Sequence, residues 1–263
     1  MNKILTIAGS DCSGGAGIQA DIKTITAHRM YAMSAIAALT AQNTTGVYGV
    51  QETPPDFLAQ QLDCIFTDIV PDAVKIGMVS SAENIRVIAD KLRQYGARHI
   101  VLDTVMVSTS GHALLRPEAV DALRTQLLPL AEVITPNLPE AEVLCGSAIA
   151  TREQMEQAGR AIAAQTSGAV LIKGGHLTGG ADDLLVSGGQ LLWFEGARVD
   201  NPNTHGTGCT LSAAIACGLA AGRSVPDAVR GAKDYLTGAL RDGLDLGAGS
   251  GPVNHCWNLC ARF

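Results

Sequence analysis

The chain reads Asn203-Thr204-His205-Gly206-Thr207-Gly208-Cys209-Thr210 immediately before a run of small residues, 211–222. This stretch predicts a tight loop that leads into a helix from about Thr210, because glycine permits backbone paths that strain other residues and alanine favours helix. The first turn of a helix presents unpaired N–H groups and partial positive charge, which predicts an anion site, with phosphate the usual anion. Cys209 would lie in that field, which predicts a lowered thiol pKa and some thiolate. A plain turn into a buried helix explains the stretch, taken alone, equally well.

Outward from this stretch, short apolar segments alternate with helical patterns along the whole chain. Buried strands are expected over 3–8, 32–39, 73–76, 99–104, 133–135 and 169–173. Hairpins are expected before residue 55 and over 183–194, and helices over 18–28, 57–66, 82–95, 117–127 and 152–165 and from about residues 139, 210 and 226. Continuous apolar strands that alternate with helices indicate a mostly parallel sheet covered on both faces. The sequence therefore predicts an α/β fold, a three-layer α/β/α sandwich that forms one domain over 1–263.

Composition restricts the class of protein and of partner. Apolar residues make up 47% of the 263 residues, enough for a sizeable core, and the net charge of −6 argues against nucleic acid as a partner. The seven cysteines are scattered and include no C-x-x-C pair, so reduced thiols in the cytoplasm are expected. The first ten residues do not resemble a signal peptide, and no apolar run is long enough to span a bilayer, so no membrane partner is expected.

Polar residues gather at the carboxyl ends of the predicted strands, which is where open parallel sheets bind their ligands. A single polar cluster at a strand end is often only a turn. Six of them at corresponding ends predict one shared cleft, and they comprise residues 9–17, 42–43, 75–78, 103–104, 135–137 and 173–176.

Two familiar phosphate-binding motifs nearly match in the N-terminal half, and both fail. Residues 15–20 fit the dinucleotide pattern G-x-G-x-x-A, but they do not follow the strand directly, and Gln42 stands near the position that needs an acidic residue. Gly9 and Gly14 have the spacing of a P-loop, but Gly15 and Ala16 replace its Lys and Ser/Thr. We therefore interpret residues 9–17 as a wall around a small substrate, with helix capping as the simpler role for Asp11.

The C-terminal half offers what phosphoryl transfer needs, namely positioning and charge neutralisation. Lys173 ends a strand before two glycines, so its ammonium is expected to point into the cleft. Asn137 and Glu140 present oxygens three residues apart at a helix start, and Asp103 ends another strand. Such a sparse set suits magnesium, which keeps waters and phosphates among its ligands. A capping box also explains Asn137 and Glu140, and the two roles are compatible.

Seven motifs together resemble those of the hydroxymethylpyrimidine/phosphomethylpyrimidine kinases, the thiamine-biosynthesis branch of the ribokinase-like superfamily. In chain order they are Gly9-Ser10-Asp11 with Ser13 to Asp21, Ala41 to Thr44, Lys75 to Met78, Val101 to Met106, Ile134 to Ala141, Lys173 to His176 and His205 to Thr210. The resemblance covers essentially the whole chain and implies a ribokinase-like fold. It also implies ATP- and Mg²⁺-dependent phosphorylation of the pyrimidine 5-hydroxymethyl group, followed by a second transfer that gives the diphosphate.

The resemblance further implies roles for individual residues. Substrate binding would fall to Gln42, whose amide can donate to and accept from an aminopyrimidine edge, and to Asp11, Ala16, Gly17, Met78 and Val105. The catalytic set would be Lys173 on the transferring phosphate and an anion hole at Gly206, Thr207, Gly208 and Cys209. Many sugar kinases carry an aspartate base at the position of Cys209, so Cys209 is interpreted as a base or as a group that only orients the hydroxyl. The nucleotide would meet Lys173, Asn137, Thr207 and Lys233, and the metal would meet Asp103, Asn137 and Glu140.

Three rival functions stay open. Pyridoxal or pyridoxine kinases are near relatives in the superfamily, a non-catalytic sensor of vitamin precursors would keep the fold, and an NAD oxidoreductase is the least favoured. Lys173, Glu140 and Cys209 argue against the sensor. Relatives in this branch are often dimers, so a homodimer is expected, and residues 108–113 and 174–180 are candidate lids.

Overall fold

A nine-stranded sheet is the centre of the computed structural model, which describes residues 1–106, 117–175, 181–196 and 198–259. The strand order is β3-β2-β1-β4-β5-β6-β7-β8-β9. Neighbouring strands from β2 to β7 are parallel, whereas β3, β8 and β9 are antiparallel to their neighbours. The strands are β1 (Lys3–Asp11), β2 (Tyr31–Asn43), β3 (Gly46–Glu52), β4 (Ala73–Ile76), β5 (Ile100–Leu102), β6 (Val133–Ile134), β7 (Ala169–Ile172), β8 (Asp183–Ser187) and β9 (Gln190–Phe194).

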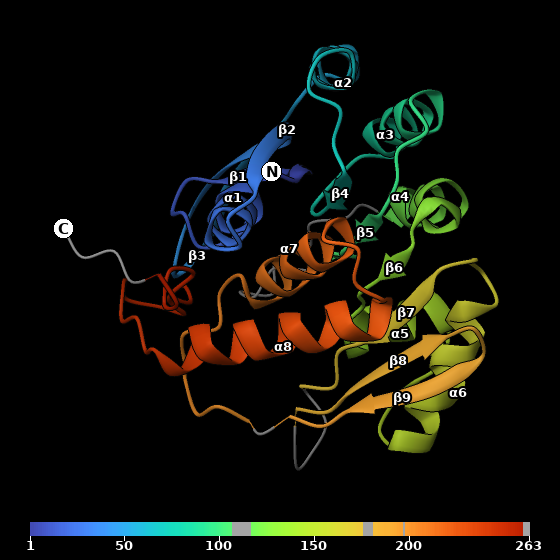
Figure 1. The fold of residues 1–263 in the computed structure, drawn as a ribbon, viewed down its shortest axis with the longest axis vertical. Helices are drawn as coiled ribbons and strands as arrows, with labels where there is room; N and C mark the ends of the chain where they lie inside the picture. The colour runs from blue at the N-terminus through green and yellow to red at the C-terminus, as the bar shows by residue number, and fades with distance from the viewer. Residues whose placement is uncertain (107–116, 176–180, 197, 260–263) are drawn as a thin grey trace.

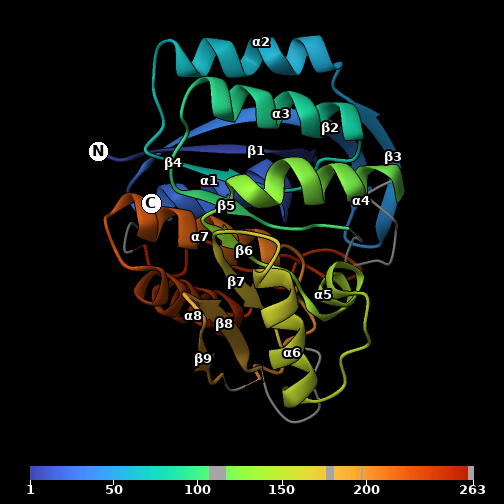
Figure 2. The same ribbon diagram turned by 90° about the vertical axis from the view of Figure 1, so that its right-hand side faces the viewer.

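Helices cover both faces of this sheet (Figure 1). One face carries α1 (Gly17–Ala27), α7 (Thr207–Ala220) and α8 (Val225–Arg241). The other face, which is turned to the viewer in Figure 2, carries α2 (Pro55–Phe66), α3 (Ala82–Gln94), α4 (Pro117–Ala122), α5 (Leu138–Cys145) and α6 (Arg152–Ala163). A π-helical turn (Leu123–Leu127) and a 3-10 turn (Leu128–Leu130) follow α4, so the helix expected over 117–127 is α-helical only in its first half.

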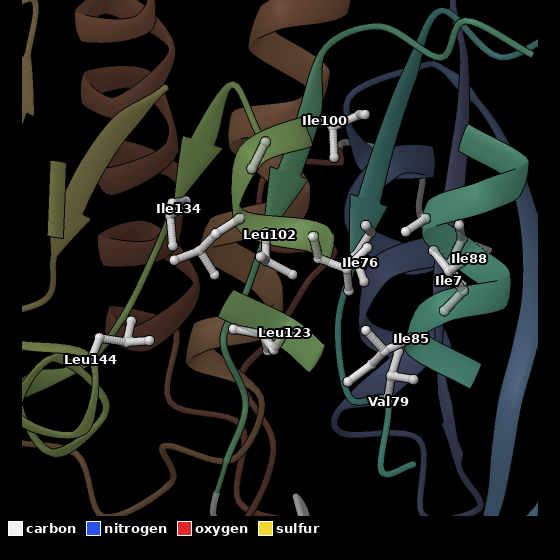
Figure 3. Close-up of a cluster of buried hydrophobic side chains, with 14 of the residues drawn as sticks. Ile7, Ile76, Val79, Ile85, Ile88, Ile100, Leu102, Leu123, Ile134 and Leu144 are labelled. Atoms are coloured by element: carbon white, nitrogen blue, oxygen red, sulfur yellow. The ribbon is translucent and has the colours of Figure 1, made fainter. Parts of the chain in front are cut away.

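The core lies in two layers, one on each face of the sheet, because consecutive strand residues point to opposite sides. In β1, Leu5 and Ile7 belong to the cluster beneath α2 to α6, whereas Ile4 belongs to the cluster beneath α1, α7 and α8. Figure 3 shows the first cluster, where Ile7 and Ile76 of the sheet meet the side chains of α3. Burial on both faces accounts for the continuous apolar runs of the central strands.

The expected three-layer α/β/α architecture with a mostly parallel sheet is confirmed, but two boundaries near the predicted site are wrong. β1 does not end at Ala8 and continues to Asp11, because it pairs with Thr40 of β2 after a register shift at Ala8/Gly9. α7 begins at Thr207 and not at Thr210, because Gly206 takes the N-cap position with φ 82°. Cys209 and the residue before it therefore belong to the first helical turn.

Across the part of the chain that the structure describes, we find no helix with the length and apolar character needed to cross a membrane.

Candidate active site

A cleft of about 1350 Å³ opens where the central strands end. The loop after β1, the end of β2, the segments after β4 to β7 and the first turn of α7 line it. The lining includes every residue for which the sequence predicts a site role: Asp11, Ala16, Gly17, Gln42, Met78, Asp103, Val105, Asn137, Glu140, Lys173, Gly206, Thr207, Gly208, Cys209 and Lys233. The structure thus brings these residues together, and their individual roles stay predictions.

The first turn of α7 forms the part of the cleft that suits an anion. Gly206 has φ 82°, and a Cβ there would lie 1.9 Å from the Gly15 carbonyl oxygen, so only glycine fits this contact with the loop after β1. Thr210 N–H bonds back to the Gly206 carbonyl at 2.9 Å. The amides of Gly208 and Cys209, like those of any first helical turn, have no intrahelical acceptor. They point with the positive end of the helix dipole toward the cleft, where they favour a phosphate.

Lys173 lies beside this helical turn. A Cβ on Gly208 would lie 3.4 Å from Lys173 Nζ and 3.4 Å from Asp103 Oδ2, and Lys173 Nζ donates to Asp103 Oδ1 at 3.0 Å. Burial disfavours the ammonium, but the carboxylates of Asp103 and Glu140 outweigh burial and raise the pKa of Lys173. A permanent cation and a helix N-terminus therefore face the same space, which is the arrangement that a migrating phosphoryl group requires.

The predicted thiolate at Cys209 is wrong. Burial takes the thiolate out of water and raises the pKa of Cys209 to about 11, and the positive charge of Lys75 opposes this rise only in part. The carboxylates of Asp21 and Asp103 add to the rise. At neutral pH the side chain is a thiol, a weak hydrogen-bonding group that can orient a hydroxyl but is a poor base.

Asn137 and Glu140 form the capping box that the sequence allows. Asn137 Oδ1 accepts from the Glu140 N–H, and Glu140 Oε2 accepts from the Asn137 N–H, both at 2.9 Å. The same Oε2 accepts from the Thr104 hydroxyl at 3.0 Å. Burial raises the pKa of Glu140, and the neighbouring charge of Asp103 adds to that rise against the opposing effect of Lys173. The pair therefore begins α5 and lines the cleft at the same time.

Asp103 is the carboxylate nearest to Lys173, and its oxygens are already engaged. Oδ1 also accepts from the Thr135 hydroxyl at 3.1 Å, and Oδ2 accepts from the Ser212 hydroxyl at 3.3 Å. Burial would raise the pKa of Asp103, but Lys173 and Lys75 outweigh burial and lower it, so the carboxylate stays charged. Oxygens that already accept hydrogen bonds fit a Mg²⁺ held mainly by phosphates and water better than a cage of direct protein ligands.

Asp11 ties two distant loops together. Its carboxylate accepts from the N–H groups of Ser13, Gly15 and Ala16, and Oδ2 lies 2.9 Å from His205 Nε2. These hydrogen bonds outweigh burial and hold the pKa of Asp11 well below its usual range. The carboxylate therefore fixes the loop after β1 against the loop before α7. Sequence analysis gave His205 no role, since no spacing rule reveals a contact between residues 194 positions apart.

The part of the cleft beside the start of α7 suits a small ring. Gln42 is half-buried at the end of β2, and its Nε2 lies 3.5 Å from His205 Nε2. Met78 is buried and Val105 is half-buried, and both contribute apolar lining. Ala16 and Gly17 add the start of α1. An amide beside an apolar surface complements the polar edge and the faces of an aminopyrimidine.

Lys233 is not the exposed helix lysine that its position suggests. Its side chain is 14% exposed, and Nζ donates to Asp183 Oδ2 at 2.5 Å and to the Ala181 carbonyl at 3.0 Å. Asp183 Oδ1 also accepts from the Gly174 N–H at 2.9 Å. This network joins α8, β8 and the segment after β7 at the cleft. Asp183 was not predicted, because a strand-initial aspartate has no distinguishing sequence signal.

Lys75 does not reach the cleft, contrary to the expectation for residues 75–78. Its side chain is fully buried, and Nζ donates to both carboxylate oxygens of Asp21 at 2.8 Å. Met78, three residues on, does line the cleft. Of the two candidate lids, 108–113 lies outside the described residues, as does 174–180 except for its first two residues.

Comparisons with known proteins show the family that this chain resembles. The family model for phosphomethylpyrimidine kinase matches residues 11–254. A protein of Rhizobium meliloti named hydroxymethylpyrimidine/phosphomethylpyrimidine kinase is 52% identical over 255 residues, which make up 95% of this chain and 96% of the relative.

Solved structures extend the likeness to three dimensions. The crystal structure of phosphomethylpyrimidine kinase from Clostridium difficile 630 is 46% identical, with a TM-score of 0.81 over 90% of this chain and 98% of its own. The structure of pyridoxal kinase from Staphylococcus aureus in complex with AMP-PCP is 34% identical, with a TM-score of 0.91 over 99% of this chain and 95% of its own. The predicted ribokinase-like fold is confirmed.

Proposed function

The chain belongs to the phosphomethylpyrimidine kinase family, and on that premise we propose that its cleft carries out two successive phosphoryl transfers in thiamine biosynthesis. The first moves the γ-phosphate of ATP to the 5-hydroxymethyl group of 4-amino-5-hydroxymethyl-2-methylpyrimidine. The second moves another γ-phosphate onto the resulting monophosphate and gives the diphosphate. The whole chain, 1–263, acts as one kinase domain.

The observation that carries this proposal is the position of Lys173 beside the first turn of α7. A Cβ on Gly208 would lie 3.4 Å from Lys173 Nζ, so the cation and the amides of that turn converge on one space. A loose phosphoryl-transfer transition state spreads its charge over the equatorial oxygens, and fixed donors stabilise that charge without reorganisation. Little base strength is needed before the bond to the leaving group breaks, so the Cys209 thiol orients the acceptor hydroxyl.

Gln42 binds the amino edge of the pyrimidine, and Met78 and Val105 pack against the ring. Asp11 acts by holding the loop of Ala16 and Gly17 in place, because its oxygens accept the loop N–H groups. Removing a partner from a buried polar edge costs about 1–3 kcal/mol, which is enough to select an aminopyrimidine over a ring without that edge.

ATP lies along the C-terminal half of the cleft, with Lys233 and Thr207 at the nucleotide. Bound Mg²⁺ would neutralise charge on the phosphates. Asp103, Asn137 and Glu140 would accept hydrogen bonds from the waters around the ion. ADP release should therefore require Mg²⁺ and stop when EDTA is in excess.

The test is coupled ADP release with Mg²⁺-ATP and three acceptors offered separately: the hydroxymethylpyrimidine, its monophosphate and pyridoxal. Both pyrimidines are expected to turn over, with kcat/KM roughly tenfold or more above that of pyridoxal. Turnover of pyridoxal alone would contradict the proposal. ADP release by Lys173→Met under the same conditions gives the background.

Phosphorylation of pyridoxal is a second, weaker activity that one observation favours. The Staphylococcus aureus pyridoxal kinase in complex with pyridoxal is similar over 99% of this chain, so a relative with the same fold binds a pyridine ring. Gln42→Leu should lower kcat/KM for the pyrimidine and leave kcat/KM for pyridoxal within about twofold, because an amino edge is absent from pyridoxal.

A homodimer formed through β3 is part of the proposal. β3 is the last strand at its edge of the sheet, and its Tyr48 and Val50 side chains are 69% and 41% exposed. An open strand edge with apolar side chains favours pairing with a second copy. Light scattering should give twice the chain mass, and Val50→Lys should shift it toward the monomer. The described cysteines are all free, which suits a cytoplasmic enzyme.

A further inference from the structure

A buried ionic network lies beneath the cleft and takes no part in the mechanism described above. Lys75 of β4, Asp21 of α1 and Thr6 of β1 are each 0% exposed. Lys75 Nζ donates to both Asp21 oxygens at 2.8 Å, and the Thr6 hydroxyl donates to Asp21 Oδ2 at 2.5 Å. None of the three lines the cleft within the described chain.

Stability alone does not explain this network. Desolvation of two charges offsets most of their attraction, and well-packed apolar residues of similar size are often as stable or more stable. β1 and β4 are central strands, and the residues next to Thr6 and Lys75 along them, Leu5, Ile7, Val74 and Ile76, are apolar and buried. An ammonium among them calls for a role beyond packing.

The Lys75 ammonium lies beside Gly77, the residue before the cleft-lining Met78. A Cβ on Gly77 would lie 2.8 Å from Lys75 Nζ. The next residue, Met78, forms cleft wall, and its Sδ would lie 3.2 Å from a Cβ on Gly9, another lining residue. Glycine at 77 thus leaves room for the ammonium to reach the carboxyl end of β4, where the ligands of such sheets bind.

Two ion pairs lie near the carboxyl ends of the central strands. Asp21 pairs with Lys75 on β4, and Asp103, at the end of neighbouring β5, pairs with Lys173, at the end of β7. Lys75 interacts electrostatically with both Asp103 and Cys209, and it is the largest influence that lowers the pKa of the Cys209 thiol against burial. Lys75 is therefore a second cation, besides Lys173, whose charge acts on Asp103 and Cys209.

We propose that Lys75, held by Asp21 and Thr6, is a positioning residue for phosphoryl transfer, whose buried charge offsets Asp103 and holds Cys209 and the first turn of α7 in their working arrangement. Lys75 touches neither substrate nor nucleotide and acts through those groups. The inference rests on the proposed kinase function. It predicts a loss in kcat with little change in KM, since ground-state contacts of the pyrimidine do not involve Lys75.

The test removes the whole network at once. In Thr6→Val/Asp21→Leu/Lys75→Met, no charge is left unpaired and the net charge is unchanged, so the fold should keep its melting temperature. kcat should fall roughly 10- to 100-fold, less than the loss of a direct donor, while KM for the pyrimidine stays within about threefold. The matched control is Lys3→Met/Asp72→Leu, which removes the half-exposed pair between β1 and the residue before β4 and should leave kcat unchanged.

A second measurement needs no turnover and so separates this inference from the proposed function. Iodoacetamide labelling of Cys209, followed by mass spectrometry of its peptide, should slow measurably in the network variant, because Lys75 lowers the pKa of this thiol more than Asp21 raises it. Cys64, an exposed free cysteine on α2, is the internal reference. If the wild-type chain phosphorylates no pyrimidine, the proposed function fails, and labelling alone decides the role of Lys75.

Either of two results would overturn the inference: a folded network variant with wild-type kcat, or one whose Cys209 labels at the wild-type rate. Should the triple variant not fold, Asp21→Asn/Lys75→Gln replaces it under the same criteria, because its paired amides keep hydrogen bonds without charge. Lys75→Arg, which keeps the charge, should retain more activity than either.

Discussion

Two lysine–aspartate pairs lie at the same edge of the sheet and differ mainly in what surrounds them. Lys75–Asp21 is 0% exposed on both sides, and the carboxylate uses both oxygens on the lysine. Lys173–Asp103 is 17% and 2% exposed, joined through one oxygen, and Lys173 lines the cleft. The Lys173 ammonium can therefore also bind a ligand in the cleft, whereas the fully buried Lys75 ammonium cannot.

This difference shows that residue type and strand position do not fix a functional role. Both lysines stand near the carboxyl end of a parallel strand with a glycine following, at 77 and at 174. What separates them is the element packed against each: α1 supplies Asp21 to close over Lys75, and the glycine-led turn of α7 leaves Lys173 open. Substitution of the two lysines should therefore give different results. Lys173→Met should mainly lower kcat, and Lys75→Met should mainly lower the free energy of unfolding.

Lys173→Met should have the largest effect on catalysis. Removing the cation beside the anion hole should lower kcat by roughly 10³-fold, because its charge stabilises the transferring phosphate. Steady-state ADP release with the pyrimidine measures this. Lys91→Met, which breaks a surface pair with Asp63, is the control and should keep wild-type kcat. A Lys173→Met enzyme within tenfold of wild type would remove Lys173 from the reaction.

Lys75→Met alone should have the largest effect on stability. It leaves the Asp21 carboxyl group buried and without its cation, which costs about 3–5 kcal/mol of unfolding free energy. Lys173→Met should cost less, because Asp103 keeps the Thr135 hydroxyl and lies next to an open cleft. Urea denaturation of both variants gives the comparison, with Lys3→Met expected within about 1 kcal/mol of wild type. Equal losses of unfolding free energy in Lys75→Met and Lys173→Met would contradict this difference between the two pairs.

Cys209→Ala should lower kcat about tenfold or more while ATP binding survives, because the orienting group is lost and the backbone amides remain. Cys209→Ser should recover most of that loss, since a hydroxyl also orients without ionising. The pKa of the thiol is raised to about 11, so the kcat profile between pH 7 and 9 should show no thiol ionisation. A serine variant as slow as the alanine variant would restore the base role of a thiolate.

Gln42→Leu should act on substrate binding rather than on the chemical step. It leaves the amino edge of the pyrimidine unpaired and should raise KM by a factor that corresponds to about 1–3 kcal/mol, with kcat little changed. Gln42→Glu keeps the side-chain shape and tests whether the amide donor is required. An unchanged KM in Gln42→Leu would place the ring elsewhere.

Much of this fold could be predicted because periodicity and turn residues report local structure directly. The apolar runs at 73–76 and 169–173 became β4 and β7, and the capping box at Asn137 and Glu140 formed as its spacing allows. The Gly206 loop and the cleft at the strand ends were also predicted, since both follow from chain-local rules about helix starts and parallel sheets.

The features that sequence analysis missed depend on burial and on contacts between distant residues. The thiolate expected at Cys209 was wrong because the helix dipole was visible in the sequence and the desolvation of the thiol was not. Lys75 was expected in the cleft because it stands near the carboxyl end of a strand. Its ion-pair partner, Asp21 on α1, lies 54 positions away, and no local sequence pattern connects the two residues. His205 and Asp183 were overlooked because their contacts with Asp11 and Lys233 exist only after folding.

The most direct test of the central claim is a single reaction followed by mass spectrometry, with the hydroxymethylpyrimidine as acceptor and Mg²⁺-ATP in excess. The monophosphate should rise first and then give way to the diphosphate, with two ADP released per pyrimidine, and Lys173→Met should form neither product at a measurable rate. Accumulation of the monophosphate without any diphosphate, or no phosphorylated pyrimidine at all, would contradict the assignment of both transfers to this cleft.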